Sequence, residues 1–153
     1  MRNKQSSKTN VLPSTAEREI DGRIEELIAR EFWLGDELVT RFCVVIIQTG
    51  QGNWKLYWDD DDEQWKLNPT KEEFCQPLEN FEVDGQTWRY PHIDLATLHS
   101  VRGQPIASFT VKCGAKVDEA SLELGNGKVL SWSYEHASEK TSLKIDCKTA
   151  RLS

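Results

Sequence analysis

The sequence predicts a mainly β fold, either an antiparallel barrel or a two-sheet sandwich built from hairpins, with one N-terminal helix. Short runs of β-branched and aromatic residues recur along most of the chain, and turn pairs such as Asp84-Gly85 and Asn126-Gly127 separate them. Helical spacing occurs only near the N-terminus. Because 153 residues suit one domain, we expect a disordered tail over 1–13 and a single domain over 14–153.

The predicted helix covers residues 15–31. Ser14 can accept hydrogen bonds from the first free amides, and Glu17, three residues later, completes a capping-box pattern. The apolar residues that then share one helical face are Ile20, Ile24, Leu27 and Ile28. Gly22 lowers helix stability by about 1 kcal/mol without interrupting this stripe. We expect the stripe to pack against the sheet.

The run 37–48 is predicted to be an internal strand. It is rich in β-branched residues, and its centre is too uniformly apolar for an exposed strand. After a turn, residues 54–58 form a second strand. Because side chains alternate along a strand, Trp54, Leu56 and Trp58 share one face.

The rest of the chain is predicted to form hairpins. The acidic run 59–63 forms a loop, because five adjacent like charges repel one another. Asp-Gly and Asn-Gly favour the positive φ angles of tight hairpin turns. Residues 99–105 are the best place for a division into halves. The expected strands are 64–67, 81–83, 87–90, 106–113, 121–124, 128–134 and 141–147.

Charge is distributed unevenly along the chain. The 19 Lys and Arg against 25 Asp and Glu give a net charge of −6, which argues against binding to nucleic acid or an anionic membrane. Residues 59–84 carry ten acidic and two basic groups, a net charge of −8, whereas residues 101–153 carry eight basic and six acidic groups. Five of the six Trp residues lie between Trp33 and Trp88, so the acidic stretch lies inside the Trp-rich region.

Two interpretations of the acidic run 59–63 are open. It is either a solvated loop that discourages edge-to-edge pairing of strands, or an anionic platform beside exposed aromatic residues. The second predicts a non-enzymatic, inhibitor-like or immunity-like cytoplasmic protein with a basic protein partner. No cofactor, metal, nucleic acid or membrane is expected to bind, and the oligomeric state stays open. The residues expected to contact the partner are Trp58, Asp59, Asp60, Asp61, Asp62, Glu63, Trp65 and Trp88.

Two other function classes are alternatives. Trp54, Trp58 and Trp65 on adjacent strands can form a stacking surface for a sugar or another flat ligand, although the same alternation can bury Trp54 and Trp58. A small hydrolase would use His92 and His136 as acid and base if the fold brought them together. Because the chain has no G-x-S-x-G, H-E-x-x-H or glycine-rich phosphate loop, we assign no catalytic residue.

The N-terminal residues and the cysteines bear on the compartment. Polar residues occupy the place where a signal peptide needs an apolar segment, which favours the cytosol. Structural zinc sites use closely spaced cysteine pairs, and the four cysteines here are 32, 38 and 34 residues apart. We therefore expect four buried free thiols, at Cys43, Cys75, Cys113 and Cys147.

Overall fold

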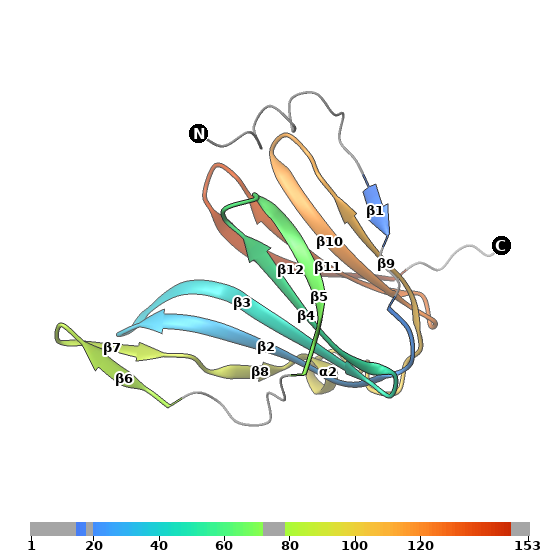
Figure 1. The fold of residues 1–153 in the computed structure, drawn as a ribbon, viewed down its shortest axis with the longest axis horizontal. Helices are drawn as coiled ribbons and strands as arrows, with labels where there is room; N and C mark the ends of the chain where they lie inside the picture. The colour runs from blue at the N-terminus through green and yellow to red at the C-terminus, as the bar shows by residue number, and fades with distance from the viewer. Residues whose placement is uncertain (1–14, 18–19, 72–78, 148–153) are drawn as a thin grey trace.

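The computed structural model describes residues 15–17, 20–71 and 79–147, and these residues form mainly β structure in two antiparallel sheets (Figure 1). The smaller sheet contains β1 (Thr15–Glu17), β9 (Ile106–Lys112), β10 (Val117–Leu124), β11 (Lys128–Glu135) and β12 (Lys140–Cys147), in that spatial order. The larger sheet contains β2 (Ile24–Leu34), β3 (Glu37–Thr49), β4 (Gly52–Asp59), β5 (Gln64–Thr70), β6 (Phe81–Val83), β7 (Gln86–Arg89) and β8 (His92–Asp94).

The larger sheet has the order β5-β4-β3-β2-β7-β6, and β8 also pairs with β2. Within the described residues neither sheet closes on itself. The two-sheet alternative is therefore the one present, and the closed barrel is wrong. The tail predicted over 1–13 lies outside the described residues.

The helix predicted over residues 15–31 is wrong. The described part of this range lies in β1, in β2 and in the segment between them. Gly22, just before β2, has a φ of 99°, a left-handed conformation that no α-helix contains. The only helix among the described residues is the single turn α2 (Leu95–Leu98), where the Asp94 carboxylate accepts a hydrogen bond from the Thr97 amide.

A β-bulge explains the helix-like spacing of the apolar residues. The pairing of β2 with β3 shifts register between Ile24 and Glu26, so that Ile24 and Leu27 are both buried although they are three positions apart. Beyond the bulge the burial alternates strictly, with Leu27 and Ala29 buried and Ile28 only half-buried. The three-residue interval therefore arose from an irregular strand rather than from a turn of helix.

The predicted hairpins are confirmed. β6 pairs with β7 across Asp84 and Gly85, whose φ angles are 52° and 79°. β10 pairs with β11 across the turn that contains Gly127, at a φ of 90°. β3 lies between β2 and β4, as its uniformly apolar centre predicts. β5 is longer than expected and includes Pro69, which an edge strand tolerates because its outer amides need no partner in the sheet.

Residues 99–105 mark the place where the chain leaves the larger sheet for the smaller one. Strands β2 to β8 precede this segment and belong to the larger sheet, whereas β9 to β12 follow it. Two backbone hydrogen bonds tie the segment to β2, from Ile24 to the Gln104 carbonyl (2.9 Å) and from Gly103 to the Ile24 carbonyl (2.7 Å).

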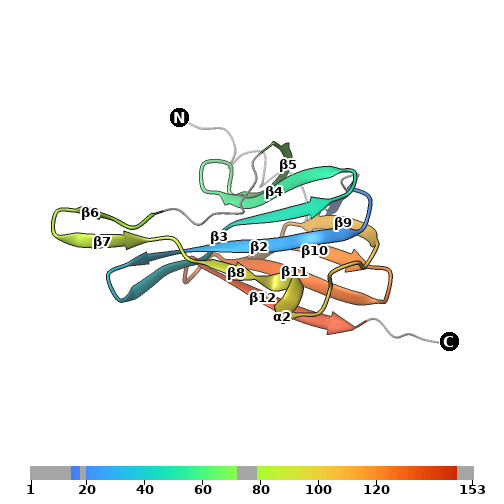
Figure 2. The same cartoon turned by 90° about the horizontal axis from the view of Figure 1, so that it is seen from below.

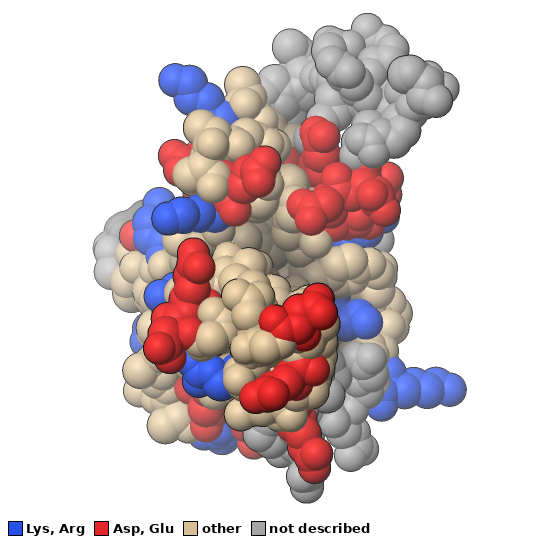
Figure 3. Space-filling model, turned by 90° about the vertical axis from the view of Figure 1, so that its left-hand side faces the viewer, with Lys and Arg blue, Asp and Glu red and all other residues tan. Residues whose placement is uncertain are grey.

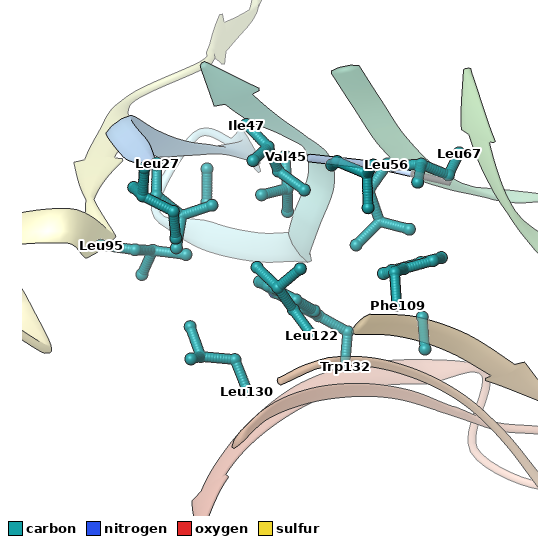
Figure 4. Packing of buried hydrophobic residues seen from close by; sticks show 14 of the residues in the cluster. Leu27, Val45, Ile47, Leu56, Leu67, Leu95, Phe109, Leu122, Leu130 and Trp132 are labelled. Atoms are coloured by element: carbon teal, nitrogen blue, oxygen red, sulfur yellow. The ribbon is translucent and has the colours of Figure 1, made fainter. Parts of the chain in front are cut away.

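The hydrophobic core lies between the two sheets, and side chains from both sheets point toward one another (Figure 4). Burying each large apolar side chain contributes about 1.5–3 kcal/mol. The core residues labelled in Figure 4 are all at most 2% exposed: Leu27, Val45, Ile47, Leu56, Leu67, Leu95, Phe109, Leu122, Leu130 and Trp132. The core therefore depends on both halves of the chain.

The burial predicted for the cysteines is wrong at two positions. Cys43 is exposed, because it lies on β3 between the buried Phe42 and Val44 and faces the other way. Cys147 is exposed at the end of the edge strand β12. Cys113 is half-buried, and Cys75 lies outside the described residues.

Candidate functional site

The acidic run forms an ordered turn between β4 and β5. The Asp59 carboxylate accepts hydrogen bonds from the backbone amides of Asp61 (2.9 Å) and Asp62 (3.3 Å). Lys66, on β5, forms ion pairs with Asp59 (3.0 Å) and Asp62. The hydrogen bond from Lys66 lowers the pKa of Asp59 below its ordinary value. Repulsion among the carboxylates is thus partly offset within the turn, which the simple loop prediction did not foresee.

Trp58 connects this turn to the smaller sheet. Its indole N–H donates to the Asp60 carboxylate (3.0 Å). Its ring stacks on Tyr134 of β11, with 3.9 Å between centroids and an interplanar angle of 10°. The imidazole of His136 meets the same indole edge-on at 5.9 Å. Trp58 therefore has contacts in both sheets, at the edge where β4 and β5 approach β10 and β11.

Carboxylates from two turns affect the pKa of Tyr134. Burial raises the pKa of the Tyr134 phenol, and the negative charges of Glu139, Asp60 and Glu63 raise it further. Asp60 and Glu63 belong to the β4–β5 turn, whereas Glu139 belongs to the turn between β11 and β12. We call the group formed by Trp58, Tyr134, His136, Asp60, Glu63 and Glu139 the Trp58–Tyr134 site.

The Trp58–Tyr134 site lies beside the β4–β5 and β11–β12 turns. Figure 1 shows the turns of β4–β5 and β11–β12 near each other at the upper end of the two sheets. The left-hand side of the molecule carries several groups of acidic side chains, with Lys and Arg side chains among them (Figure 3). Tyr134 and Glu139 were not predicted, because they lie more than 70 residues from Trp58 and no motif links them, and His136 was named only for the hydrolase alternative.

Trp65 supports the site from within the core. It is only 3% exposed, and its indole N–H donates to the backbone carbonyl of Asp118 (3.1 Å). The Asp118 side chain is fully buried, accepts a hydrogen bond from the Gly114 amide (2.9 Å) and lies 3.4 Å from Nε2 of His136. Trp65 therefore positions neighbouring strands and is not part of the surface.

Trp88 lies elsewhere. It is on β7, and β3 and β2 separate that strand from β4. Its ring contacts Phe32 at 5.1 Å and Phe81 at 5.5 Å. The structure therefore divides the predicted set: Trp58 and the acidic turn lie together, Trp65 lies beneath them, and Trp88 belongs to a second aromatic group.

The structure also places the residues named for the sugar-binding and hydrolase alternatives. Trp54 and Trp58 are half-buried against the core, on the same strand face as Leu56, as the alternation predicts. His92 lies on β8, where Arg30 donates to its ring nitrogen (3.3 Å). His136 follows β11 in the other sheet.

Within residues 15–17, 20–71 and 79–147, no group of three or more His, Cys, Asp or Glu side chains is arranged to hold a metal ion. Over the same residues, no helix is long and apolar enough to cross a bilayer. Comparisons of the chain with protein-family models, with curated proteins and with solved structures find no match.

Proposed function

We propose that this protein is a non-enzymatic cytoplasmic binding protein that presents the Trp58–Tyr134 site to a basic surface of a protein partner, in the manner of an inhibitor or immunity protein. One observation carries the proposal. The negative charges of two separate turns, Asp60 and Glu63 in one and Glu139 in the other, raise the pKa of Tyr134, whose ring stacks on Trp58. Carboxylates and the faces of aromatic rings both attract Lys and Arg side chains.

The hydrogen bonds within the β4–β5 turn favour binding. The Asp59 carboxylate holds the backbone of the turn, and Asp60 holds the Trp58 indole. A partner therefore meets side chains that are already ordered, which lowers the entropy cost of association. Because the carboxylates are mainly exposed, their main effect is expected on the association rate, through long-range attraction of a basic surface.

The same charges disfavour phosphate-rich ligands. The run 59–63 carries five negative charges, and Lys66 forms ion pairs with two of them, Asp59 and Asp62. Such a surface repels nucleic acid and suits a protein whose basic surface itself binds phosphate groups. The burial of Trp65 leaves the sugar-binding alternative without one of its three rings.

Affinity capture with matched charge variants tests the proposal. The tagged protein is incubated with lysate of its source organism at about 50 mM and about 500 mM salt, which change the screening length severalfold. The site variant combines Asp60→Asn, Glu63→Gln and Glu139→Gln. The control variant combines Asp21→Asn, Glu25→Gln and Asp146→Gln at exposed positions outside the site, so both variants change the net charge from −6 to −3.

At low salt, we expect a basic protein to be captured by wild type and by the control variant but not by the site variant. At high salt, we expect none of the three proteins to capture it. Circular dichroism and thermal melts establish that all three proteins are folded. Equal capture of the same basic protein by the site variant would overturn the proposal. Absence of any salt-sensitive basic protein would overturn it as well.

A further inference from the structure

A second aromatic surface is built around the β6–β7 hairpin. We call the four rings of Phe32, Phe81, Trp88 and Tyr90 the hairpin cluster. Phe32 stacks on Tyr90 at 5.1 Å and 16°, and Phe81 stacks on Trp88 at 5.5 Å and 26°. Phe81 also lies 6.1 Å from Tyr90 at 25°. The rings therefore form one continuous group, in which these three pairs are stacked and the Phe32–Trp88 pair is tilted by 43°.

The hairpin cluster lies outside the core. None of its four rings belongs to the cluster of buried residues between the sheets. The hairpin extends beyond the rest of the larger sheet, as both ribbon views show (Figures 1 and 2). Phe81 is 46% exposed and Val83, on the same strand, is 40% exposed. A contiguous apolar surface of this kind on a projecting element is typical of an interaction site.

The hairpin itself is acidic. Residues 79–88 contain Glu79, Glu82 and Asp84 and no Lys or Arg, a net charge of −3. All three acidic residues are exposed. The next residue, Arg89, donates a hydrogen bond to the Gly35 carbonyl (3.2 Å) and lies over the Trp33 ring. Its charge is therefore directed toward Gly35 and Trp33 and not toward the acidic side chains of the hairpin. Phe81, the exposed ring of the hairpin cluster, is thus bordered by negative charge.

We propose that the hairpin cluster binds an arginine side chain in a basic segment of a protein partner. A guanidinium group is planar and weakly hydrated, so it can stack on an exposed ring such as Phe81 while its N–H groups bond to a neighbouring carboxylate. Lysine cannot stack in this way. A second copy of this chain is disfavoured, because two hairpins of the same negative charge repel each other.

This contact is separate from the Trp58–Tyr134 site. β3 and β2 lie between β4, which carries Trp58, and β7, which carries Trp88. A basic partner could use both surfaces, but the hairpin cluster is inferred from its own rings and charges. Each surface can therefore be tested while the other is unchanged.

Indole NMR signals report on the two surfaces individually. The protein has six Trp residues, so a sample labelled with ¹⁵N at tryptophan gives six indole signals, and Trp88→Phe assigns the one from the hairpin. The probes are a short peptide of alternating Arg and Thr and a Lys–Thr peptide of the same length and charge. We expect the Arg peptide to shift the Trp88 signal and to bind about three-fold more tightly than the Lys peptide.

Variants separate ring stacking from general attraction. Phe81→Leu keeps an apolar side chain and removes the ring, and we expect about three-fold weaker binding of the Arg peptide. Glu82→Gln with Asp84→Asn is expected to weaken binding too, and Asn-Gly preserves the tight turn. The control Leu98→Ala changes a residue that is 64% exposed on α2, and it should leave binding unchanged.

Two results would overturn the inference. In one, the Arg peptide leaves the Trp88 signal unmoved, even if the Trp58 signal shifts, which would leave the proposed function intact. In the other, the Arg and Lys peptides bind equally and Phe81→Leu has no effect. Conversely, a Trp88 shift that persists in the Asp60→Asn/Glu63→Gln/Glu139→Gln variant supports a separate surface, whatever becomes of the proposed function.

Discussion

The Trp58 ring lies 3.9 Å from the Tyr134 ring, nearly parallel to it, and joins the β4–β5 turn to β11 in the opposite sheet. The indole N–H is at the same time bonded to Asp60. One side chain therefore links the acidic turn, the edge of the larger sheet and the smaller sheet. This link places charges from two distant parts of the sequence on one surface.

The stacked pair is expected to stabilise the fold through its rings. A double-mutant cycle with Trp58→Leu and Tyr134→Leu should give a coupling free energy of about 0.5–1.5 kcal/mol, which is typical of aromatic pairs. Urea unfolding of the two single variants and the double variant measures it. Tyr134→Phe keeps the ring and serves as the control for the hydroxyl group. Strictly additive effects of Trp58→Leu and Tyr134→Leu would show that the stack contributes no coupling.

Asp118 is expected to support the site from beneath. Its fully buried carboxylate accepts the Gly114 N–H, so Asp118→Ala leaves a partly buried donor without this acceptor. We expect a loss of about 1–3 kcal/mol in the free energy of unfolding. The neighbouring Glu119→Ala, at a half-buried position, should cost no more than about 0.5 kcal/mol. Equal stabilities of the two variants would contradict the role given to Asp118.

The core between the sheets is tested by cavity formation. Leu122 is fully buried on β10 and faces residues of the larger sheet, so Leu122→Ala should lower the free energy of unfolding by about 2–5 kcal/mol. Leu98 is 64% exposed, and Leu98→Ala should change the free energy of unfolding by about 0.5 kcal/mol or less. Chemical denaturation gives both values. A small effect at Leu122 would be inconsistent with two sheets sharing one core.

Two histidines are expected to make stability depend on pH. Burial lowers the pKa of His92 and His99, and the charges of Arg30 and Lys128 respectively lower these pKa values further. Between these lowered values and the unfolded pKa of about 6.5, the unfolded chain binds more protons. The free energy of unfolding should therefore fall as the pH decreases through about 6.5 toward the folded-state pKa values.

The variant His92→Gln with His99→Gln isolates this histidine effect. Urea unfolding at several pH values from about 8 to about 5 should show a flatter profile for the variant than for wild type. Carboxylates with lowered pKa values, such as Asp94, act in a separate range, because their stabilisation is lost only near and below their unfolded pKa of about 3.9. Identical slopes for variant and wild type between pH 7 and pH 5 would refute the assignment.

Local sequence signals predicted the hairpins and the internal strand well. Asp84-Gly85 needs positive φ at both positions and has it, and the apolar centre of β3 is buried between two neighbours. The helix prediction failed because the bulge after Ile24 changes the interval between buried residues from two to three. Such a bulge depends on the pairing with β3, so the sequence of β2 alone cannot reveal it.

The candidate site was only partly predictable. The acidic turn and Trp58 are adjacent in sequence, and their proximity required no knowledge of the fold. Tyr134 and Glu139 come from another sheet, so only the packing of β4 and β5 against the smaller sheet brings them near Trp58. Trp65 and Trp88 also show that clustering of Trp in sequence does not imply one surface, since one is in the core and the other is on β7.

The association rate with the captured basic partner tests the central claim most directly. Stopped-flow measurements compare wild type, the Asp60→Asn/Glu63→Gln/Glu139→Gln variant and the Asp21→Asn/Glu25→Gln/Asp146→Gln control at several salt concentrations. At about 10 mM salt, we predict that the site variant associates about ten-fold more slowly than wild type, that the control stays close to wild type, and that the difference disappears at about 500 mM. Equal association rates for the site variant and wild type at low salt would contradict the account.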